Sequence, residues 1–240
     1  MSMLEPSPTV GQPPSSPHLP YSTADQEPRH LEYNMRFKVQ ARELLRSIRP
    51  PSSEFTVLDF GCGRGEFLQM LHDDGFSCTG VDFDPVCVDL SSRYATCFKA
   101  GSDDVREVMA GKQFDCVTAL HVLEHLDNPR QTVEDLKVLS RRWFIFAVPN
   151  LAIPTALCRR QIKAVNSGHS VGWDPGHFQT FLENRCGLRI VRWIPDQVIL
   201  PSVSRLAERL AVRRWLENIW LPKRFPFLST SLITLCEKVS

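Results

Sequence analysis

The stretch that most constrains the fold of this chain is residues 56–68, TVLDFGCGRGEFL. Val57 and Leu58 are typical of the end of a short buried strand. The glycines at 61, 63 and 65 favour a turn in which the backbone comes close to a ligand. Apolar residues then recur at helical spacing until Gly75, where we expect the helix to end. Strand, glycine turn and helix form the first half of a nucleotide-binding βαβ unit, whose helix N–H groups face the crevice.

The second half of this unit follows at the expected distance. Residues 78–81 are predicted to form the next strand, which ends at Asp82. In such folds, an acidic residue about 20 residues past the glycine turn accepts hydrogen bonds from both ribose hydroxyls. The glycines follow the pattern Gly-x-Gly-x-Gly rather than the Gly-x-Gly-x-x-Gly of the dinucleotide fingerprint. Asp59 would also lie unfavourably beside a pyrophosphate, so an NAD-linked oxidoreductase is a distant alternative.

Four linked motifs resemble those of the class I S-adenosylmethionine-dependent methyltransferases. They are LDFGCGRG at 58–65, GVDFDP at 80–85, FDCV at 114–117 and HVLEH at 121–125, within a resemblance that covers residues 55–180. The resemblance implies an α/β fold, namely a Rossmann-like, doubly wound sheet of seven mostly parallel strands with an antiparallel last strand. It also implies S-adenosyl-L-methionine as the cofactor.

The composition is that of an ordinary globular protein. The chain has 240 residues, of which 42% are hydrophobic and 23% charged, so one substantial core is expected. The net charge of +1 creates no global field that would recruit nucleic acid. We find no apolar run that would span a bilayer and no signal-peptide pattern. Eight scattered cysteines without a Cys-x-x-Cys pair predict buried thiols in a reducing cytoplasm.

The predicted organisation is a tail followed by one domain. Residues 1–28 are rich in proline and serine, which predicts a disordered or extended tail that either docks on a partner or is idle. Residues 29–240 are predicted to form a single methyltransferase domain with a helical cap over 30–49 and a substrate loop over 151–177. Strands are expected at 96–100, 114–120, 143–148, 188–194 and 231–238, and helices at 85–94, 130–140 and 178–186.

The resemblance assigns cofactor-binding roles to particular residues. The predicted set is Asp59, Gly61, Cys62 and Gly63 for the methionine portion, Asp82 for the ribose, Phe83, Ser102 and Asp103 for the adenine, and His121 near the sulfonium. Family members often have an aspartate in the slot that Ser102 occupies here. Asp103 is therefore an alternative contact for the adenine amino group.

Histidines are the candidate catalytic bases, because imidazole titrates near neutral pH. His121 is the first choice, since it lies at a strand tip facing the crevice; His177 and His125 follow, with His169 nearby. The alternative is that Glu124 and His125 hold the loop. The spacing His-x-x-Glu-His also matches a zinc pattern, but that pattern requires a helix, and here it follows a strand. Some family members hold a divalent metal with Glu-x-x-Glu-His at this loop; because His121 takes the first position here, we expect no metal.

His169, Trp173 and Tyr33 are the predicted substrate contacts. The loop 168–178 is interpreted as a mobile lid with an aromatic wall, and the alternative is that Trp173 packs as a plug. Residues 204–221 form a basic, tryptophan-containing amphipathic pattern, which is typical of a helix that packs on its own domain or lies on a membrane surface.

The functional prediction is methyl transfer to a small-molecule or lipid-linked acceptor, at oxygen. The alternative is a non-catalytic S-adenosylmethionine-binding partner that regulates another enzyme. No nucleic-acid partner is expected, and the sequence indicates no oligomeric state.

Overall fold

The computed structural model describes residues 28–152, 168–199 and 212–239, with side chains from residue 35 onward. The predicted tail therefore lies almost wholly outside the described residues, as do residues 153–167 of the predicted substrate loop. Among the described helices, none combines the length and the apolar character that crossing a bilayer requires.

A single seven-stranded sheet organises the described residues. Its order is β3-β2-β1-β4-β5-β7-β6. The first five strands pair in parallel, and β7 lies antiparallel between β5 and β6. The predicted fold class is confirmed, including the antiparallel last strand. The strands are β1 (Thr56–Phe60), β2 (Ser77–Asp82), β3 (Thr96–Lys99), β4 (Phe114–Leu120), β5 (Ser140–Pro149), β6 (Leu188–Pro195) and β7 (Ser231–Lys238).

Helices follow most strands, and three of them begin at a dipeptide of Asp or Asn and Pro. Asp84-Pro85, Asn128-Pro129 and Asp174-Pro175 each place a capping side chain before a proline in the first turn. The helical elements before β5 are α1 (Pro28–Ile48), α2 (Glu66–Asp74), α3 (Pro85–Ser91), α4 (Val105–Val108), η2 (Leu123–His125) and α5 (Pro129–Leu139). Those after β5 are α6 (Pro175–Thr180), η4 (Phe181–Arg185), α8 (Arg213–Trp215), η5 (Leu216–Trp220), α9 (Leu221–Arg224) and η6 (Pro226–Leu228).

The helix predicted at 178–186 begins earlier, at Pro175, and two other helical elements also differ from the predictions. The second crossover helix ends at Ser91 instead of continuing to Tyr94, because the chain already turns there and the Tyr94 N–H donates to the Ser91 carbonyl. The short α4 was not predicted, since four residues carry too little periodicity to be recognised. By contrast, α2 ends at Gly75 as predicted, where φ is 90°.

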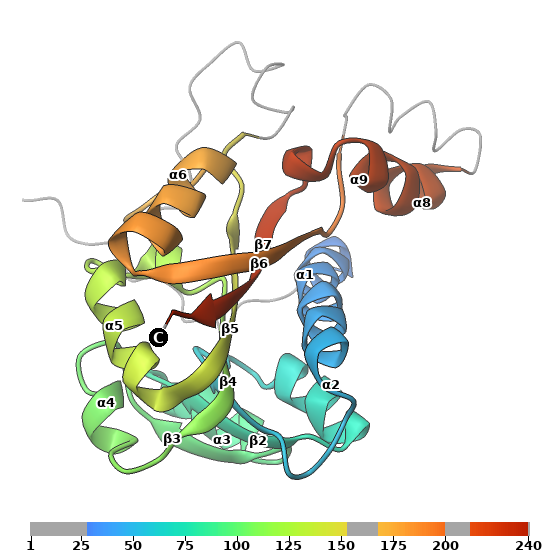
Figure 1. Cartoon of the computed structure of the whole chain (residues 1–240). Helices are drawn as coiled ribbons and strands as arrows, with labels where there is room; N and C mark the ends of the chain where they lie inside the picture. Colours follow the sequence, from blue (N-terminus) through green and yellow to red (C-terminus); the bar gives the residue numbers. More distant parts are fainter. Residues whose placement is uncertain (1–27, 153–167, 200–211, 240) are drawn as a thin grey trace, which may run out of the picture.

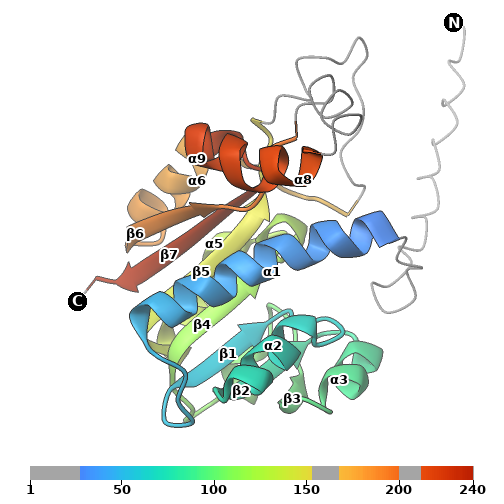
Figure 2. The same cartoon turned by 90° about the vertical axis from the view of Figure 1, so that its right-hand side faces the viewer.

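The sheet is covered on both faces, as a mostly parallel sheet requires. On one face, α1 buries a stripe of Phe37, Ala41, Leu44 and Leu45 together with residues of α2 and the sheet. Figure 2 shows α1, α2 and α3 in front of the strands. On the opposite face, α5 and α6 pack on the other side chains of the same strands. Figure 1 shows these two helices on the far side of the sheet from α1.

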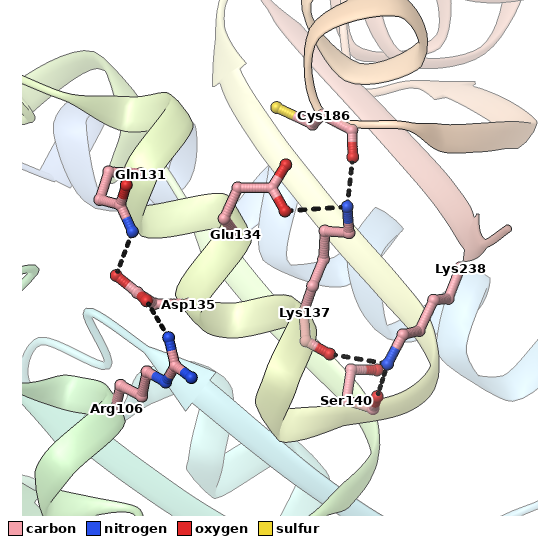
Figure 3. A network of polar contacts seen from close by, with 8 residues as sticks. All are labelled: Arg106, Gln131, Glu134, Asp135, Lys137, Ser140, Cys186 and Lys238. Carbon is pink, nitrogen blue, oxygen red and sulfur yellow. Dashed lines mark hydrogen bonds and ion pairs between the residues drawn. The ribbon is translucent and has the colours of Figure 1, made fainter. Parts of the chain in front are cut away.

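A polar network far from the strand tips fastens α5 to its neighbours (Figure 3). The Lys137 ammonium donates to Glu134 at 3.0 Å and to the Cys186 carbonyl at 2.7 Å. Lys238, near the end of β7, donates to the carbonyls of Lys137 and Ser140 at 3.0 and 3.3 Å. These contacts hold α5 between η4 and β7 and leave the opposite end of the sheet for a ligand.

The order of the strands determines where that ligand site lies. β1 pairs with β2 on one side and with β4 on the other, so the chain leaves β1 in one direction and returns in the other. Open α/β sheets bind ligands in the crevice beyond the carboxyl ends of the strands at such a switch point. The residues after β1, β2 and β4 therefore lie at the expected ligand crevice.

Candidate functional site

The turn after β1 requires its first glycine. Gly61 has φ of 75°, and a Cβ at this position would lie 2.3 Å from Val122 Cγ2 in the loop after β4. The amides of Gly61 and Cys62 both donate to the Val81 carbonyl, at 2.7 and 3.0 Å. The turn is thus held against β2 and packed on the β4 loop, which brings the three strand tips together.

Asp82, at the end of β2, is the centre of this arrangement. Its Oδ2 accepts the Gly63 N–H at 2.8 Å and its Oδ1 accepts the Asp84 N–H at 2.9 Å. Burial raises the pKa of Asp82, and these two backbone donors oppose that rise. Each carboxylate oxygen can accept more than one hydrogen bond, so both retain capacity for a diol. The role of Asp82 in binding the ribose stays a prediction.

The residues predicted to frame an adenine lie next to Asp82. Phe83 exposes 72% of its surface, and its Cβ lies 3.7 Å from the Cβ position of Gly101, which follows β3. The Ser102 hydroxyl donates to Asp103 Oδ1 at 3.3 Å, and Asp103 is exposed. An exposed phenyl ring beside polar groups can stack on a base and contact its edge.

Cys62 cannot contribute its side chain to the crevice. It is buried, and its sulfur lies 3.5 Å from Ser91 Oγ, which in turn is 3.1 Å from the Cys97 sulfur. A Cβ on Gly80 would come within 2.8 Å of the Cys97 sulfur and 3.0 Å of the Cys62 sulfur, so Gly80 makes room for both. Hydrogen bonding from Cys62 lowers the pKa of Cys97. Any role of Cys62 toward a ligand is therefore a backbone role.

A buried charged group flanks the glycine turn. Burial raises the pKa of Asp59 to about 7, while a hydrogen bond from Thr118 at 2.6 Å and the charge of Lys38 lower it. Lys38, on α1, is buried and pairs with Glu66 at 3.1 Å. This cation and these carboxylates suit the zwitterionic end of an amino acid.

His121 lies just past β4 in a backbone conformation that is rare for its type. Its φ is 57°, in the left-handed region that costs a non-glycine residue about 1 kcal/mol or more. Phe37 of α1 stacks on the imidazole at 4.1 Å. Its Nδ1 faces Glu124 Oε1 at 3.3 Å and its Nε2 faces Ser231 Oγ at 3.0 Å. Both ring nitrogens thus have partners, which makes His121 a wall of the crevice more than a free base.

Glu124 lies next to His121 and close to two further histidines, His125 and His169. Its side chain is buried, and both carboxylate oxygens have no hydrogen-bond partner among the described residues. His125 Nδ1 lies 2.8 Å from the Gly168 carbonyl, so this nitrogen carries the proton in the neutral ring and Nε2 carries the lone pair. His169 packs edge-on to His125 with ring centroids 4.8 Å apart. Burial lowers the pKa of His169.

This histidine–glutamate cluster, defined as Glu124, His125 and His169, has the donor set of a divalent-cation site. One ligand atom from each residue lies within 4.8 Å of the others. A metal-binding histidine often donates its second ring N–H to a backbone carbonyl, as His125 does to Gly168. The Glu124 carboxylate makes ion-pair contacts with His121 and His125 but no hydrogen bond among the described residues, so a cation would supply the missing interaction. The residues therefore fit such an ion, although the sequence led us to expect none.

Three predicted residues are placed elsewhere or remain untested. Trp173 is 6% exposed and packs against Phe178 and Phe181 in the core, with ring centroids 5.4 and 4.6 Å away. Trp173 therefore packs as a plug, which was the alternative interpretation. The prediction that it lines an open aromatic wall is wrong. His177 is exposed, and its ring and N–H both contact Asp174, the residue that caps α6. The side chain of Tyr33 lies outside the described residues.

Sequence reasoning missed several residues of the site. Lys38 is adjacent to Phe37 on α1, but a charge beside an apolar stripe usually indicates the solvent boundary. Ser231 reaches His121 from 110 residues away, and no local pattern indicates that contact. The HVLEH motif indicated that Glu124 holds the loop after β4, but it did not indicate that the side chain is buried.

Comparison with known proteins agrees with this geometry. A family profile described as a methyltransferase domain matches residues 29–224. Among curated proteins, the chain resembles ubiquinone biosynthesis O-methyltransferases. The protein from Pseudomonas paraeruginosa is 36% identical over 85 residues, and the mitochondrial protein of Schizosaccharomyces pombe is 31% identical over 81. These matches cover 32% and 31% of this chain and only 36% and 30% of those proteins.

Solved structures share the fold at low sequence identity. Magnesium protoporphyrin IX methyltransferase from Synechocystis PCC 6803, with bound SAH, has a TM-score of 0.59 at 14% identity, covering 88% of this chain and 85% of that one. The N-methyltransferase NodS from Bradyrhizobium japonicum, in complex with S-adenosyl-L-homocysteine, has a TM-score of 0.56 at 15% identity, covering 90% of each chain. This degree of likeness concerns the fold and leaves the substrate open.

Proposed function

The chain belongs to the methyltransferase-domain family, and from this premise we propose that it binds S-adenosyl-L-methionine and methylates a small-molecule or lipid-linked acceptor at oxygen. The observation that carries the proposal is the carboxylate of Asp82, held by two backbone N–H groups at the tip of β2 between the glycine turn and the exposed ring of Phe83. The ubiquinone-pathway relatives, which are named as O-methyltransferases, support oxygen as the acceptor atom.

The crevice residues fit each part of this cofactor. Asp82 binds the ribose diol, and Phe83 and Ser102 contact the adenine. The amides of Gly61 and Gly63 already donate within the protein, so the backbone there offers carbonyl oxygens to the ammonium group of the methionine portion. Asp59 and Lys38 lie beside that end and complement its opposite charges. His121, stacked on Phe37, closes the pocket on the sulfonium side.

When bound, S-adenosylmethionine supplies a methyl group on a positively charged sulfur, and an acceptor oxygen displaces the neutral thioether in one step. The protein contributes alignment and exclusion of water. The hydroxyl proton must also leave, because an alkoxide or phenolate is the better nucleophile. We assign this proton to His125 or His169. His121 is positioned by Glu124 and Ser231 and becomes a base only if it gives up one of those contacts.

A second way to activate the acceptor is a divalent cation in the histidine–glutamate cluster. The specific observation that favours it is the buried carboxylate of Glu124, which makes no hydrogen bond among the described residues and lies close to the imidazoles of His125 and His169. One carboxylate and two imidazoles suit zinc, manganese or iron, and bound cations lower the pKa of a coordinated hydroxyl. In this case the same histidines act as ligands and not as bases.

The experiment separates binding from turnover. Purified protein is first titrated with S-adenosylhomocysteine, and we expect a raised melting temperature and a measurable binding heat. It is then incubated with cofactor labelled with carbon-13 in the methyl group and either a lipid extract or an aqueous metabolite extract. The chemical shift of the transferred methyl group distinguishes oxygen from nitrogen and carbon acceptors.

Each result decides between the candidates. Label in a lipid or small-molecule product at oxygen supports the enzyme. Binding without transfer in every extract supports the alternative, a non-catalytic partner that regulates another enzyme. Absence of any binding by S-adenosylhomocysteine refutes the cofactor assignment itself.

A further inference from the structure

Residues 212–228 carry large apolar side chains on their outer side. We call these side chains the aromatic face: Trp215, Ile219, Trp220, Phe225 and Phe227, which expose 53%, 46%, 45%, 40% and 49% of their surface. A single exposed apolar side chain is common on protein surfaces, but five within 13 residues form a concentration that marks a contact surface.

The segment is fixed to the protein by its other side, so the aromatic face does not cover its own core. Leu221 and Pro222 are buried, and Glu217 is buried and paired with Arg213 at 3.0 Å. The Val198 N–H donates to the Glu217 carbonyl at 2.9 Å. The helices from α8 to α9 thus present a defined side to the outside.

The charges next to the aromatic face indicate what kind of partner can bind to it. Within residues 212–228, the exposed charged side chains are Arg214, Lys223 and Arg224, all basic, and the one carboxylate, Glu217, is buried. The Arg224 guanidinium lies 5.3 Å from the Phe225 ring centroid. Tryptophan and phenylalanine rings with adjacent long basic side chains match the boundary between acyl chains and anionic headgroups.

Residues 212–228 lie at the same end of the sheet as the crevice. The Asn150 side chain, just past the end of β5, donates to the Phe227 carbonyl at 3.0 Å and to the Ser229 carbonyl at 2.8 Å. Figures 1 and 2 both show α8 and α9 at the end of the sheet where β5 terminates. This is also the end at which β1, β2 and β4 form the crevice, so a surface docked on the aromatic face would lie close to an acceptor entering there.

We propose that the aromatic face docks the protein onto a bilayer that carries anionic headgroups. The docking itself does not require the proposed function; it deepens that function by placing a lipid-linked acceptor at the mouth of the crevice. The rings insert at the level of the headgroups, and Arg214, Lys223 and Arg224 contact lipid phosphates. Each basic residue near an anionic surface strengthens binding about fivefold.

The test is co-sedimentation of the full chain with vesicles of phosphatidylcholine alone or mixed with phosphatidylglycerol. We expect binding to the mixed vesicles, weakened by high salt, together with a blue shift of tryptophan fluorescence. The double variant Trp215→Ser/Trp220→Ser should lose at least tenfold in vesicle affinity, and Lys223→Glu/Arg224→Glu should lose the preference for anionic lipid. Val191→Ser, which changes an apolar side chain on β6 that is 49% exposed, is the matched control and should bind like the wild type.

Two outcomes overturn the proposal. One is that wild-type protein fails to sediment with anionic vesicles. The other is that light scattering shows a dimer that Trp215→Ser/Trp220→Ser dissociates, which would assign the aromatic face to a second copy of this chain. The melting-temperature shift with S-adenosylhomocysteine is measured on the same samples. It should be equal in wild type and variants, so failure of membrane docking is distinguishable from failure of the cofactor assignment.

Discussion

Replacing Asp82 with asparagine tests the cofactor assignment most directly. The substitution keeps the size of the side chain but removes its charge and one acceptor oxygen. In the structure, the two carboxylate oxygens accept from Gly63 at 2.8 Å and from Asp84 at 2.9 Å. An asparagine can satisfy only one of these donors and turns its NH₂ group toward the other. It also loses charge-assisted hydrogen bonds to the ribose.

The magnitude follows from these lost contacts. A hydrogen bond to a charged group contributes about 1.5–3 kcal/mol, and about 1.4 kcal/mol corresponds to a factor of ten. We therefore expect Asp82→Asn to weaken S-adenosylhomocysteine binding by about 10- to 100-fold. One unsatisfied backbone N–H should also lower the free energy of unfolding of the ligand-free protein by about 1–3 kcal/mol.

A matched control separates these two effects. Asp115, at the opposite end of the sheet, accepts the Thr56 N–H at 2.9 Å and its hydroxyl at 2.8 Å. Both of these donors use one oxygen, Oδ2, so Asp115→Asn keeps their acceptor and loses mainly the ion pair with Arg141; it should destabilise the fold less than Asp82→Asn and leave cofactor affinity unchanged. Isothermal titration calorimetry gives the affinities, and urea unfolding gives the stabilities. If folded Asp82→Asn binds S-adenosylhomocysteine as tightly as the wild type, the assignment of Asp82 to the ribose is wrong.

Further predictions concern the same crevice. Because the folded pKa of Asp59 is about 7, well above the unfolded value of about 4, its contribution to stability is present at low pH and is lost as the pH rises from 4 through 7. Asp59→Asn should therefore be more stable than the wild type by up to about 4 kcal/mol at pH 8, and equally stable at pH 4. Urea unfolding at both pH values measures this difference. A stability difference that does not grow with pH would contradict the reasoning. Gly61→Ala should lower the free energy of unfolding by about 3 kcal/mol or more, because Gly61 has a positive φ and the added Cβ would clash with Val122. The melting temperature measures this loss. His121→Ala should weaken S-adenosylhomocysteine binding and methyl transfer together, because His121 forms a wall of the cofactor pocket, whereas a loss of transfer with unchanged affinity would make His121 the base. Zinc or manganese should raise the melting temperature of the wild type and not of Glu124→Gln, and equal shifts in both proteins would exclude a metal at the cluster.

Local sequence patterns determined the framework of this protein. The bounds predicted for β4 and β7 agree with the structure, as does the end of α2 at Gly75. These elements are recognisable because apolar periodicity and glycine act over a few residues and do not depend on distant partners. The position of Asp82 follows for the same reason, since the end of a parallel strand determines which edge of the sheet its last residue reaches.

Long-range packing decided the rest. The residues around Trp173 have the composition of an exposed loop, yet the Trp173 side chain is buried because it packs against Phe178 and Phe181. His121 was predictable as a strand-tip residue, but its engagement with Ser231 exists only because β7 inserts next to β5. A side chain's chemistry depends on which groups desolvate it and bond to it, and those groups come from anywhere in the chain. The sequence alone therefore determined which glycine turn and which strand ends form the crevice, whereas the tertiary structure added Lys38 and Ser231 and decided which side chains are held by partners and which can meet a ligand.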